Sequence, residues 1–356
     1  MVIDNFNSVF KNTNTFITGH TGFKGSWLTL WLSNLHSNIS GLSLEAEANS
    51  HWDDLEISIV NNNIGDIREY DFVEESLLRA NPEIIFHLAA QPLVRESYKT
   101  PIETWKTNVI GTANLLQAAR KLNDLKAIVV ITSDKCYENI EIDKGYKEDD
   151  ILGGHDPYSS SKAAVEVLVS SFRRSYFSDV NSPRLVTARA GNVIGGGDWS
   201  KDRLIPDLIR SSVEGNPMLI RYPNSTRPWQ HVLDCNYGYL QLAMKIASSL
   251  SVKENAFNFG PSQKSNAKVK EILKKIKSFW PSISWELDDQ GNPHEAGFLY
   301  LDSSLSRDVL NWKPILNLEN TLKMTIDWYK NYNEDIISSR NQLSEYTKLL
   351  QDSSKN

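Results

Sequence analysis

The sequence predicts an α/β protein built on a doubly wound parallel sheet, with a smaller α/β lobe beside it. Over the first 190 residues, short apolar runs alternate with longer segments whose apolar residues recur at helical spacing. Right-handed connections between such strands place helices on both faces of the sheet. The chain of 356 residues has room for a second unit, and a glycine-rich loop leaves the predicted sheet after residue 190.

The composition excludes several functional classes. A net charge of −6 and a pI near 5.7 offer no basic face to nucleic acid or to an anionic membrane. No run of 18 apolar residues is present, and residues 1–14 lack the apolar core of a secretory signal. Only Cys136 and Cys235 occur, without a CxxC or Cys/His cluster, so we expect no metal site. Two lone cysteines fit a reducing cytoplasm.

The first predicted strand, residues 15–18, leads directly into a glycine-rich turn. A segment with apolar residues at helical spacing follows, from Trp27 to Leu35. Strand, glycine turn and helix form the context of a Rossmann-like dinucleotide site, where the backbone approaches the pyrophosphate at the helix N-terminus. The glycines here are spaced GxxGxxG. We expect cofactor contacts at Gly19, Thr21, Gly22, Phe23, Lys24 and Gly25.

The second predicted strand, residues 39–44, ends where the adenosine ribose lies in such a fold. Residues 41–56 carry several acids and no lysine or arginine. A 2′-phosphate would find no positive partner there, so the sequence favours NAD over NADP. Ser43 occupies the end of this strand, with Glu45 just beyond it, and we expect Ser43 at the ribose.

The next two strands supply further cofactor contacts. After the strand at 60–64 comes Asp66, which could accept a hydrogen bond from the adenine amino group or could cap a helix. The strand starting at Ile84 runs into small residues that either admit a flat cofactor or pack a tight turn. One long helix is expected over 101–122. The expected contacts are Asp66, Ile67, Leu88, Ala89, Ala90 and, on the long helix, Asn108.

Three polar residues follow the strand at 127–131, at the edge where ligands of parallel sheets bind. Ser133 is placed to hydrogen-bond a substrate hydroxyl, while Asp134 and Lys135 bring a carboxylate and an amine to the same cavity. On their own, these residues are equally typical of a polar loop and a surface ion pair.

Tyr158 and Lys162 are four residues apart, so they lie on one face of a helix expected over 158–176. An ammonium beside a phenol favours the ionised phenol and lowers its pKa from about 10. Such a phenol can take the proton of a sugar hydroxyl while hydride leaves for a nicotinamide. The alternative is an ordinary helix with Tyr158 inside and Lys162 in solvent. The glycine turn and Ser133 favour the catalytic interpretation.

The motifs GxxGxxG, HLAAQ, TSDK and YSSSK, in this order, resemble the extended short-chain dehydrogenase/reductase family in its nucleotide-sugar epimerase and dehydratase branch. The resemblance covers residues 13–329. Within the branch, the CDP-glucose 4,6-dehydratases are most similar, through the strings GHTGFKGSWL, HLAAQPLVRESY, TSDKCYEN, RAGNVIGGGDW and RPWQHVLD. The resemblance implies NAD regenerated in each cycle, CDP-glucose as substrate, and a 4-keto-6-deoxy sugar made for surface polysaccharide.

The resemblance also implies a role for each catalytic candidate. Tyr158, assisted by Lys162, would deprotonate the C4 hydroxyl of the sugar, whose oxygen Ser133 orients. Asp134 would protonate the departing hydroxide at C6, and Lys135 would act at C5, where dehydratases of dTDP- and GDP-sugars carry a glutamate. The alternatives are a 4-epimerase, a dehydratase of another nucleotide sugar, and a non-catalytic NAD-binding regulator.

The second half of the chain supplies the substrate contacts. A glycine-rich loop, residues 191–199, follows the strand at 184–189, and in the family the position of Asn192 contacts the substrate diphosphate. Guanidinium groups bind phosphate bidentately, so Arg203 and Arg227 are candidates for a diphosphate clamp. The segment 294–302 resembles a family segment near the nucleotide. We expect the remaining substrate contacts at Gln91, His231 and Tyr300.

For the domains, we expect an NAD-binding unit over 1–190, which 229–262 rejoins. The lobe comprises 191–228 and 263–332, and a polar C-terminal tail, frayed at its end, covers 333–356. By resemblance, the helices at 101–122 and 158–176 form a four-helix interface, so a homodimer or homotetramer is expected. The alternative for these helices is simple packing on the sheet.

Overall fold

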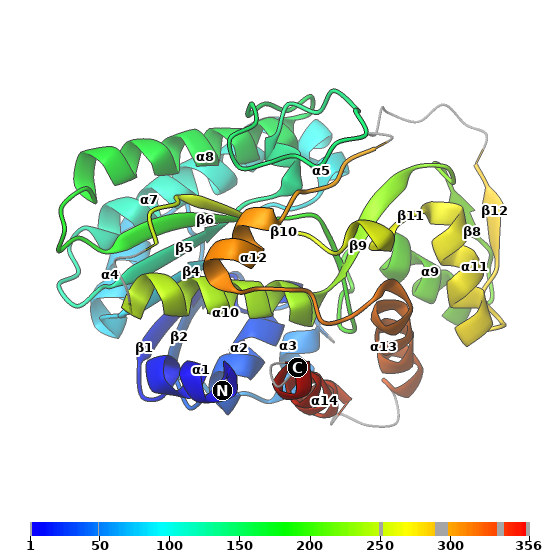
Figure 1. The fold of residues 1–356 in the computed structure, drawn as a ribbon, viewed down its shortest axis with the longest axis horizontal. Helices are drawn as coiled ribbons and strands as arrows, with labels where there is room; N and C mark the ends of the chain where they lie inside the picture. Colours follow the sequence, from blue (N-terminus) through cyan, green and yellow to red (C-terminus); the bar gives the residue numbers. More distant parts are fainter. Residues whose placement is uncertain (1, 49, 249–251, 289–297, 333–337, 354–356) are drawn as a thin grey trace.

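The computed structural model describes residues 2–48, 50–248, 252–288, 298–332 and 338–353. At its centre lies a seven-stranded sheet with the order β10-β6-β5-β4-β1-β2-β3, in which all neighbours are parallel (Figure 1). This confirms the doubly wound α/β fold. The strands are β1 Asn14–Thr18, β2 Asn38–Ser43, β3 Asn61–Ile64, β4 Ile84–His87, β5 Ala127–Ile131, β6 Arg184–Ala190 and β10 Ala256–Phe259.

Helices cover both faces of this sheet because its strands are apolar on both sides. In Figure 1, α7 and α8 lie above the sheet, and α1, α2 and α10 lie below it. The upper layer comprises α4 Tyr70–Ala80, α5 Val94–Lys99, α6 Pro101–Trp105, the π-helical turn η1 Lys106–Ile110, α7 Gly111–Ala119 and α8 Pro157–Tyr176. The lower layer comprises α1 Val2–Phe10, α2 Phe23–Asn34, α3 His51–Leu55 and α10 Val232–Ser248.

The long helix expected over 101–122 is instead three helical segments in succession, ending at Ala119. The π-helical turn η1 interrupts the α-helical hydrogen bonds at Asn108. There the hydroxyl of Thr112 donates to the Asn108 carbonyl at 2.6 Å, and the Asn108 amide nitrogen donates to Ser161 Oγ on α8 at 2.8 Å. This turn therefore joins the helix layer to the helix that carries Tyr158.

A smaller lobe lies beside the sheet, to the right in Figure 1. It contains a three-stranded sheet in the order β11-β9-β7 and a two-stranded pair, β12 with β8. Strand β10 and helix α10 lie with the main sheet, although in sequence they fall between two segments of the lobe. This agrees with a lobe made of two separate segments, and the exact domain boundaries remain a prediction. The lobe elements are β7 Asn192–Ile194, α9 Leu204–Val213, β8 Met218–Ile220, β9 Thr226–His231, η3 Gln263–Ser265, β11 Asn266–Lys268, α11 Val269–Phe279, β12 Trp285–Leu287 and α13 Leu318–Asn331. Helix α12 Ser304–Leu310, which falls in the segment expected in the lobe, packs instead against β10 and α10 (Figure 1).

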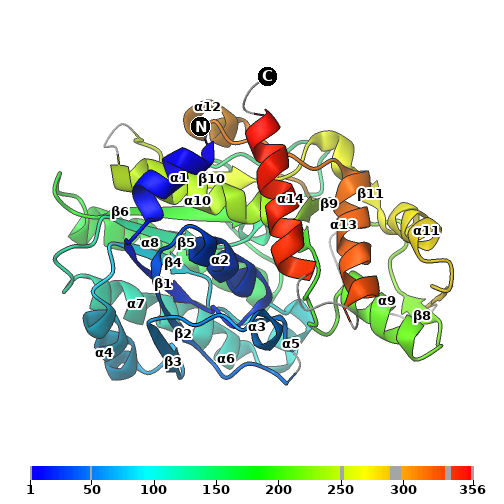
Figure 2. The same cartoon turned by 90° about the horizontal axis from the view of Figure 1, so that it is seen from below.

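Two helices at the ends of the chain were not predicted. Phe6 and Phe10 of α1 are completely buried, and α14, Ser338–Ser353, lies beside α1 across the base of the molecule (Figure 2). Tyr346 of α14 donates a buried hydrogen bond of 2.7 Å to Asp234 Oδ1 on α10. The polar tail expected over 333–356 therefore contains a packed helix at 338–353, while 333–337 and 354–356 lie outside the described residues.

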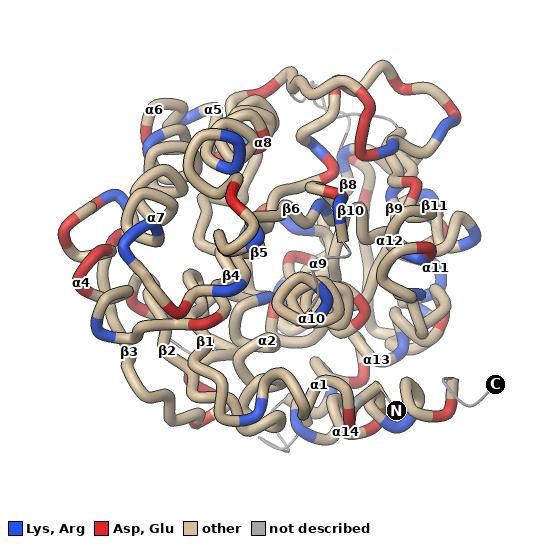
Figure 3. The backbone as a smooth tube through the Cα atoms, turned by 60° about the vertical axis from the view of Figure 1, so that its left-hand side comes forward, with Lys and Arg blue, Asp and Glu red and all other residues tan. Residues whose placement is uncertain are grey.

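The charged residues follow no single-sign face on the side that Figure 3 shows, where basic and acidic positions alternate along the backbone. Among the helices that the structure describes, none combines the length and the apolar character needed to cross a membrane. Within the same residues, no group of three or more His, Cys, Asp or Glu side chains is arranged to hold a metal ion. Cys136 and Cys235 are both free thiols and both are buried.

Candidate active site

One cleft of about 1080 Å³ runs along the carboxyl ends of the strands, between the sheet and the lobe. It opens at the point where the strand order reverses, which is where ligands bind in open α/β sheets. Most of the predicted site residues line it together. They are Gly19, Thr21, Gly22, Phe23, Lys24, Gly25, Ser43, Asp66, Ile67, Leu88, Ala89, Ala90, Ser133, Asp134, Lys135, Tyr158, Lys162, Asn192, Arg203 and Arg227.

The floor of the cleft is the glycine turn between β1 and α2. Gly19 has φ of +75°, and a Cβ there would lie 2.8 Å from the Ala89 nitrogen. A Cβ on Gly25 would lie 2.0 Å from the Gly19 carbonyl oxygen, so the turn closes only on glycine. Gly22 precedes α2 without a capping side chain. The first turn of α2 thus presents its positive dipole end and backbone to the cleft, which fits a pyrophosphate.

The far end of the cofactor half is polar. Ser43 Oγ and Thr21 Oγ1 are 2.6 Å apart at the end of β2, where Glu47 also lines the cleft. Arg68, which the sequence reasoning missed, lies here as well, but its Nη2 is 2.6 Å from Asp66 Oδ2. The hydrogen bonds from Arg68 lower the pKa of Asp66. Because this guanidinium is already paired, the donor set fits the free ribose hydroxyls of NAD.

Helix α8 carries the tyrosine–lysine pair to the cleft. The helix starts at Pro157, and Asp156 caps it by accepting from the Ser159 nitrogen at 2.9 Å. Tyr158 is 7% exposed and Lys162 is 5% exposed. The ammonium of Lys162 donates to the Ile131 carbonyl at 3.3 Å. Burial and the charge of Lys24 lower the pKa of Lys162 to about 8.

The expectation that Lys162 brings the phenol of Tyr158 towards neutral pKa is not met. Burial raises the pKa of Tyr158 to about 12, although a hydrogen bond with Ser133 lowers it. The physical reason is that the free-energy cost of removing a phenolate from water exceeds the stabilisation that this one hydrogen bond provides. Tyr158 therefore stands protonated in this structure, with Ser133 as its hydrogen-bond partner.

The segment after β5 folds back in the short turn η2, Asp134–Cys136, which brings its acid and its amine together. The hydroxyl of Ser133 donates to Asp134 Oδ1 at 3.0 Å and accepts from the backbone nitrogen of Lys135 at 3.2 Å. Lys135 Nζ lies 3.9 Å from Asp134 Oδ1. A Cβ on Gly191 would lie 3.0 Å from Asp134 Oδ2, so the glycine at this loop leaves room for the carboxylate.

Arginines gather on the lobe side of the cleft. Arg203 Nη1 is 3.3 Å from Asp198 Oδ2, and Arg227 is only 6% exposed, with Nη1 donating to the Thr226 carbonyl at 3.0 Å. Two further arginines were missed by the sequence reasoning because only the fold brings them here from separate segments. They are Arg95 on α5 and Arg221 after β8, which lie 3.3 and 3.4 Å from Asp202 Oδ1.

Two predicted residues support the cleft from behind instead of lining it. The Gln91 side chain accepts from the Leu93 nitrogen at 2.6 Å and donates to Thr104 Oγ1 at 2.9 Å, so it shapes its own loop. Asn108 accepts from the Gln91 nitrogen at 2.8 Å. Neither residue is among those that line the cleft, and the expected contacts of Gln91 with substrate and of Asn108 with cofactor stay predictions.

His231 and Tyr300, expected at the substrate, do not line the cleft either. His231 is completely buried, its Nδ1 accepts from the Leu233 nitrogen at 3.2 Å, and burial lowers its pKa to about 3. The Tyr300 hydroxyl accepts from Gln263 Nε2 at 3.3 Å in the lobe. Residues 294–297 of the segment that resembles a nucleotide contact lie outside the described residues.

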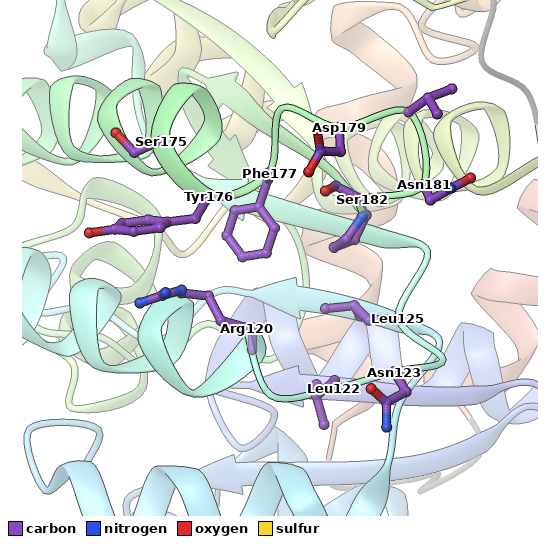
Figure 4. A pocket seen from close by; sticks show the side chains of 13 residues that line it. Arg120, Leu122, Asn123, Leu125, Ser175, Tyr176, Phe177, Asp179, Asn181 and Ser182 are labelled. Atoms are coloured by element: carbon purple, nitrogen blue, oxygen red, sulfur yellow. The ribbon is translucent and has the colours of Figure 1, made fainter.

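A second cavity, of about 730 Å³, lies at the ends of α7 and α8 that point away from the active-site cleft (Figure 4). The guanidinium of Arg120 lies 3.9 Å from the ring centroid of Tyr176, so this contact ties the two helix ends together. None of the predicted site residues lines this cavity.

Comparison with known proteins agrees with this site. The family model described as GDP-mannose 4,6 dehydratase matches residues 16–325. A CDP-glucose 4,6-dehydratase of Salmonella typhimurium is 43% identical, over 97% of this chain and 98% of that protein. A dTDP-glucose 4,6-dehydratase of Haemophilus influenzae is 27% identical, over 89% of this chain and 97% of that protein.

A solved structure of similar fold is the UDP-glucuronic acid 4-epimerase of Bacillus cereus, in complex with UDP-glucuronic acid and NAD. It has a TM-score of 0.75 and 22% identity, and covers 89% of this chain and 99% of that one. The likeness shows a shared fold. With the family model spanning most of the sequence, the chain belongs to the GDP-mannose 4,6-dehydratase family of NAD-dependent nucleotide-sugar dehydratases and epimerases.

Proposed function

We propose that this chain dehydrates CDP-glucose to CDP-4-keto-6-deoxyglucose, an early step of deoxysugar synthesis for surface polysaccharide. The observation that carries the reaction is the Asp134–Lys135 acid–base pair, 3.9 Å apart, which follows Ser133 in the segment facing Tyr158. A 4-epimerase needs a tyrosine, a lysine and NAD, but not this additional pair. The CDP-glucose 4,6-dehydratase relative at 43% identity supports the nucleotide.

NAD is the proposed cofactor, and when bound it would accept hydride from C4 of the sugar and return it to C6. The glycine turn and α2 would hold the pyrophosphate, Ser43 the ribose, and Asp66 with Ile67 the adenine. Leu88, Ala89 and Ala90 would line the path to the nicotinamide. This set supports NAD over NADP because Arg68, the basic side chain nearest to Asp66, is held in ion pairs with Asp66 and Glu103.

The first proton transfer falls to Tyr158. Its phenolate, formed once the phenol has released its own proton, would receive the C4 hydroxyl proton, while Ser133 orients the C4 oxygen. The hydrogen bond with Ser133 favours the phenolate, and Lys162 lies one turn further along α8. A phenol with a pKa of about 12 requires such stabilisation to act near neutral pH.

The elimination falls to the acid–base pair. Lys135, as a neutral amine, would remove the proton at C5 made acidic by the neighbouring ketone, and Asp134, as a carboxylic acid, would protonate the C6 hydroxyl, which leaves as water. Lys135, whose side chain is 25% exposed, would then supply C5 with a proton that has exchanged with solvent as C6 is reduced. The proton that Tyr158 took from the C4 hydroxyl would replace the one that Asp134 gave to the departing water.

The lobe would hold the diphosphate. The same side of the cleft is lined by Asn192, Arg203 and Arg227. Of the two arginine side chains, Arg227 is the more buried. Buried guanidinium groups form strong charge-assisted hydrogen bonds to phosphate. Arg95 and Arg221 are additional donors at this end.

The test is mass spectrometry of the purified protein incubated with NAD and CDP-glucose, with UDP-glucose, dTDP-glucose and GDP-mannose in parallel. Loss of one water from CDP-glucose alone supports both reaction and substrate. Loss of water from another nucleotide sugar overturns the nucleotide assignment and keeps the mechanism. An unchanged mass with a shifted retention time identifies a 4-epimerase, and an unchanged sugar with bound NAD fits a non-catalytic NAD-binding protein.

We also propose a homodimer, with a homotetramer as a further pairing, in the cytoplasm. Several large apolar side chains are exposed on the adjacent helices α6, η1 and α8, among them Ile102, Trp105, Ile110 and Val167. A second copy that covers this face would remove them from water. In sedimentation experiments, Trp105→Glu with Val167→Glu should give a monomer, and an unchanged dimer would contradict this interface.

A further inference from the structure

The segment that carries Ser133, Asp134 and Lys135 is held from behind at both ends. On one side, the hydroxyl of Thr132 donates to Glu166 Oε1 at 2.5 Å. On the other side, the hydroxyl of Tyr137 accepts from Arg189 Nη1 at 2.7 Å and donates to Asn258 Oδ1 at 2.7 Å. The three proposed catalytic residues thus lie between two residues that are fixed by one buried network.

Glu166 and Arg189 are themselves a bidentate ion pair. Arg189 Nε lies 3.0 Å from Glu166 Oε1, and Nη2 lies 2.8 Å from Oε2. Both side chains are 4% exposed. Burial alone would favour the neutral carboxyl, but Arg189 and the hydroxyls of Thr132 and Thr187 lower the pKa of Glu166. Such an enclosed pair is rigid because each partner satisfies the other and has no water to replace it.

The position of Glu166 links this pair to the tyrosine–lysine pair. Tyr158, Lys162 and Glu166 are spaced by four residues and share one face of α8. Lys162 contacts the Ile131 carbonyl and Glu166 contacts the next residue, Thr132. One face of α8 therefore contacts two consecutive residues at the end of β5. Arg189 on β6 completes the connection to the neighbouring strand.

We infer that Glu166 and Arg189 are positioning residues, which fix Asp134 and Lys135 relative to Tyr158 so that oxidation at C4 and loss of water at C6 occur in the same bound sugar. The inference rests on the proposed dehydratase function. Neither residue lines the cleft, so both act through Thr132 and Tyr137. Loosening the network moves Asp134 and Lys135, while Tyr158 and Lys162 keep their places on the helix. The loss of water at C6 is then slowed more than the oxidation at C4.

The test uses two threonines that both donate to the Glu166 carboxylate. Thr132 Oγ1 lies 2.5 Å from Oε1 and connects the catalytic segment, whereas Thr187 Oγ1 lies 2.8 Å from Oε2 and belongs to β6. Thr132→Val and Thr187→Val each remove one hydroxyl donor with little change in shape. Replacing Glu166 or Arg189 would leave an uncompensated buried charge and destabilise the whole fold, so the threonines are the cleaner probes.

The measurement is the ratio of dehydrated product to 4-keto sugar that retains its C6 hydroxyl, with CDP-glucose and NAD. Thr132→Val should lower this ratio about tenfold, as expected for one lost hydrogen bond to a charged acceptor. Thr187→Val should leave the ratio unchanged, and Thr132→Ser, which keeps the hydroxyl, should restore it. Equal ratios in Thr132→Val and wild type would overturn the inference, because a purely structural role predicts parallel loss of both steps.

Hydrogen–deuterium exchange of the segment 132–137 gives a second readout that needs no turnover. Thr132→Val should raise its exchange, and Thr187→Val should leave it protected. If the wild type dehydrates no nucleotide sugar, the proposed function fails and the exchange comparison alone decides the anchoring role of Glu166. If the wild type dehydrates CDP-glucose and both valine variants exchange equally, the inference fails and the proposed function stands.

Discussion

Lys135 Nζ lies 3.9 Å from Asp134 Oδ1, and the two side chains differ sharply in their surroundings. The carboxylate is 2% exposed, whereas the lysine side chain is 25% exposed and reaches the open cleft. The short turn η2 brings these neighbours in sequence to the cleft that Tyr158 also lines. The arrangement supplies a proton donor and a proton acceptor for adjacent carbon atoms of a sugar, which is what an elimination across C5 and C6 requires.

Replacing Lys135 with methionine should lower the rate of dehydration by about 100-fold to 10,000-fold, because the base at C5 is lost. Oxidation at C4 depends on Tyr158 and should be less affected. Incorporation of solvent deuterium at C5 measures the step directly. Lys144→Met is the matched control, since Lys144 pairs with Asp150 at 3.3 Å on an exposed loop. Full C5 exchange in Lys135→Met would refute the assignment of the base.

Removing the Arg227 guanidinium should weaken binding of CDP-glucose more than binding of NAD. For Arg227→Met we expect substrate affinity to fall by about 10-fold to 100-fold, the loss of one or two charge-assisted hydrogen bonds to phosphate. Arg227→Lys should not restore it, because an ammonium lacks the planar fork. Calorimetric titration with each ligand makes the comparison, with Arg120→Met at the second cavity as control. Equal loss of NAD affinity would point to a folding defect.

The glycines of the turn should respond differently to alanine. A Cβ on Gly25 would lie 2.0 Å from the Gly19 carbonyl oxygen, so Gly25→Ala forces the backbone apart and should lower the yield of folded protein. A Cβ on Gly22 lies 3.4 Å from the same oxygen, so Gly22→Ala should fold. Its added methyl group would still keep the pyrophosphate away from the first turn of α2. Thermal melts and NAD titrations separate the two effects, and tight NAD binding by Gly22→Ala would contradict the predicted cradle.

Lys162 should make stability depend on pH in alkaline solution. Burial lowers its pKa from 10.5 to about 8, so between these values the unfolded chain holds a proton that the native chain has released. Stability therefore rises with pH across this window, by about 3 kcal/mol from this residue, and this gain is lost as pH falls through 8. Urea unfolding from pH 7.5 to 10 should show the rise in wild type and in Lys144→Met, but not in Lys162→Met. Parallel curves would contradict the buried position of the ammonium.

The sheet and the cofactor turn were predictable because their signals are local. The central strand β5 is a continuous apolar run, and the turn after β1 needs glycines at fixed positions. The terminal helices also carry a local signal in the sequence. Phe6 and Phe10 are four residues apart, and α14 repeats buried apolar residues at Leu343, Tyr346 and Leu350 within a polar segment.

Other features depend on contacts between distant segments. The side chains of Gln91 and His231 carry the right chemistry for a ligand, but their partners lie in the protein, and residue type alone does not reveal which way a side chain turns. Arg95 and Arg221 come from separate segments and meet at the cleft, where both approach Asp202. The pKa of Tyr158 likewise depends on burial, which raises it, and the spacing of Tyr158 and Lys162 does not reveal that burial.

The central claim is an internal transfer of hydrogen, from C4 to C6 of one sugar, combined with loss of water. CDP-glucose that carries deuterium at C4, incubated with the protein and NAD in ordinary water, tests it most directly by mass spectrometry and NMR. The account predicts a product that has lost one water and retains the deuterium at C6, with solvent hydrogen at C5. A product of unchanged mass with deuterium still at C4 would contradict the account and identify an epimerase.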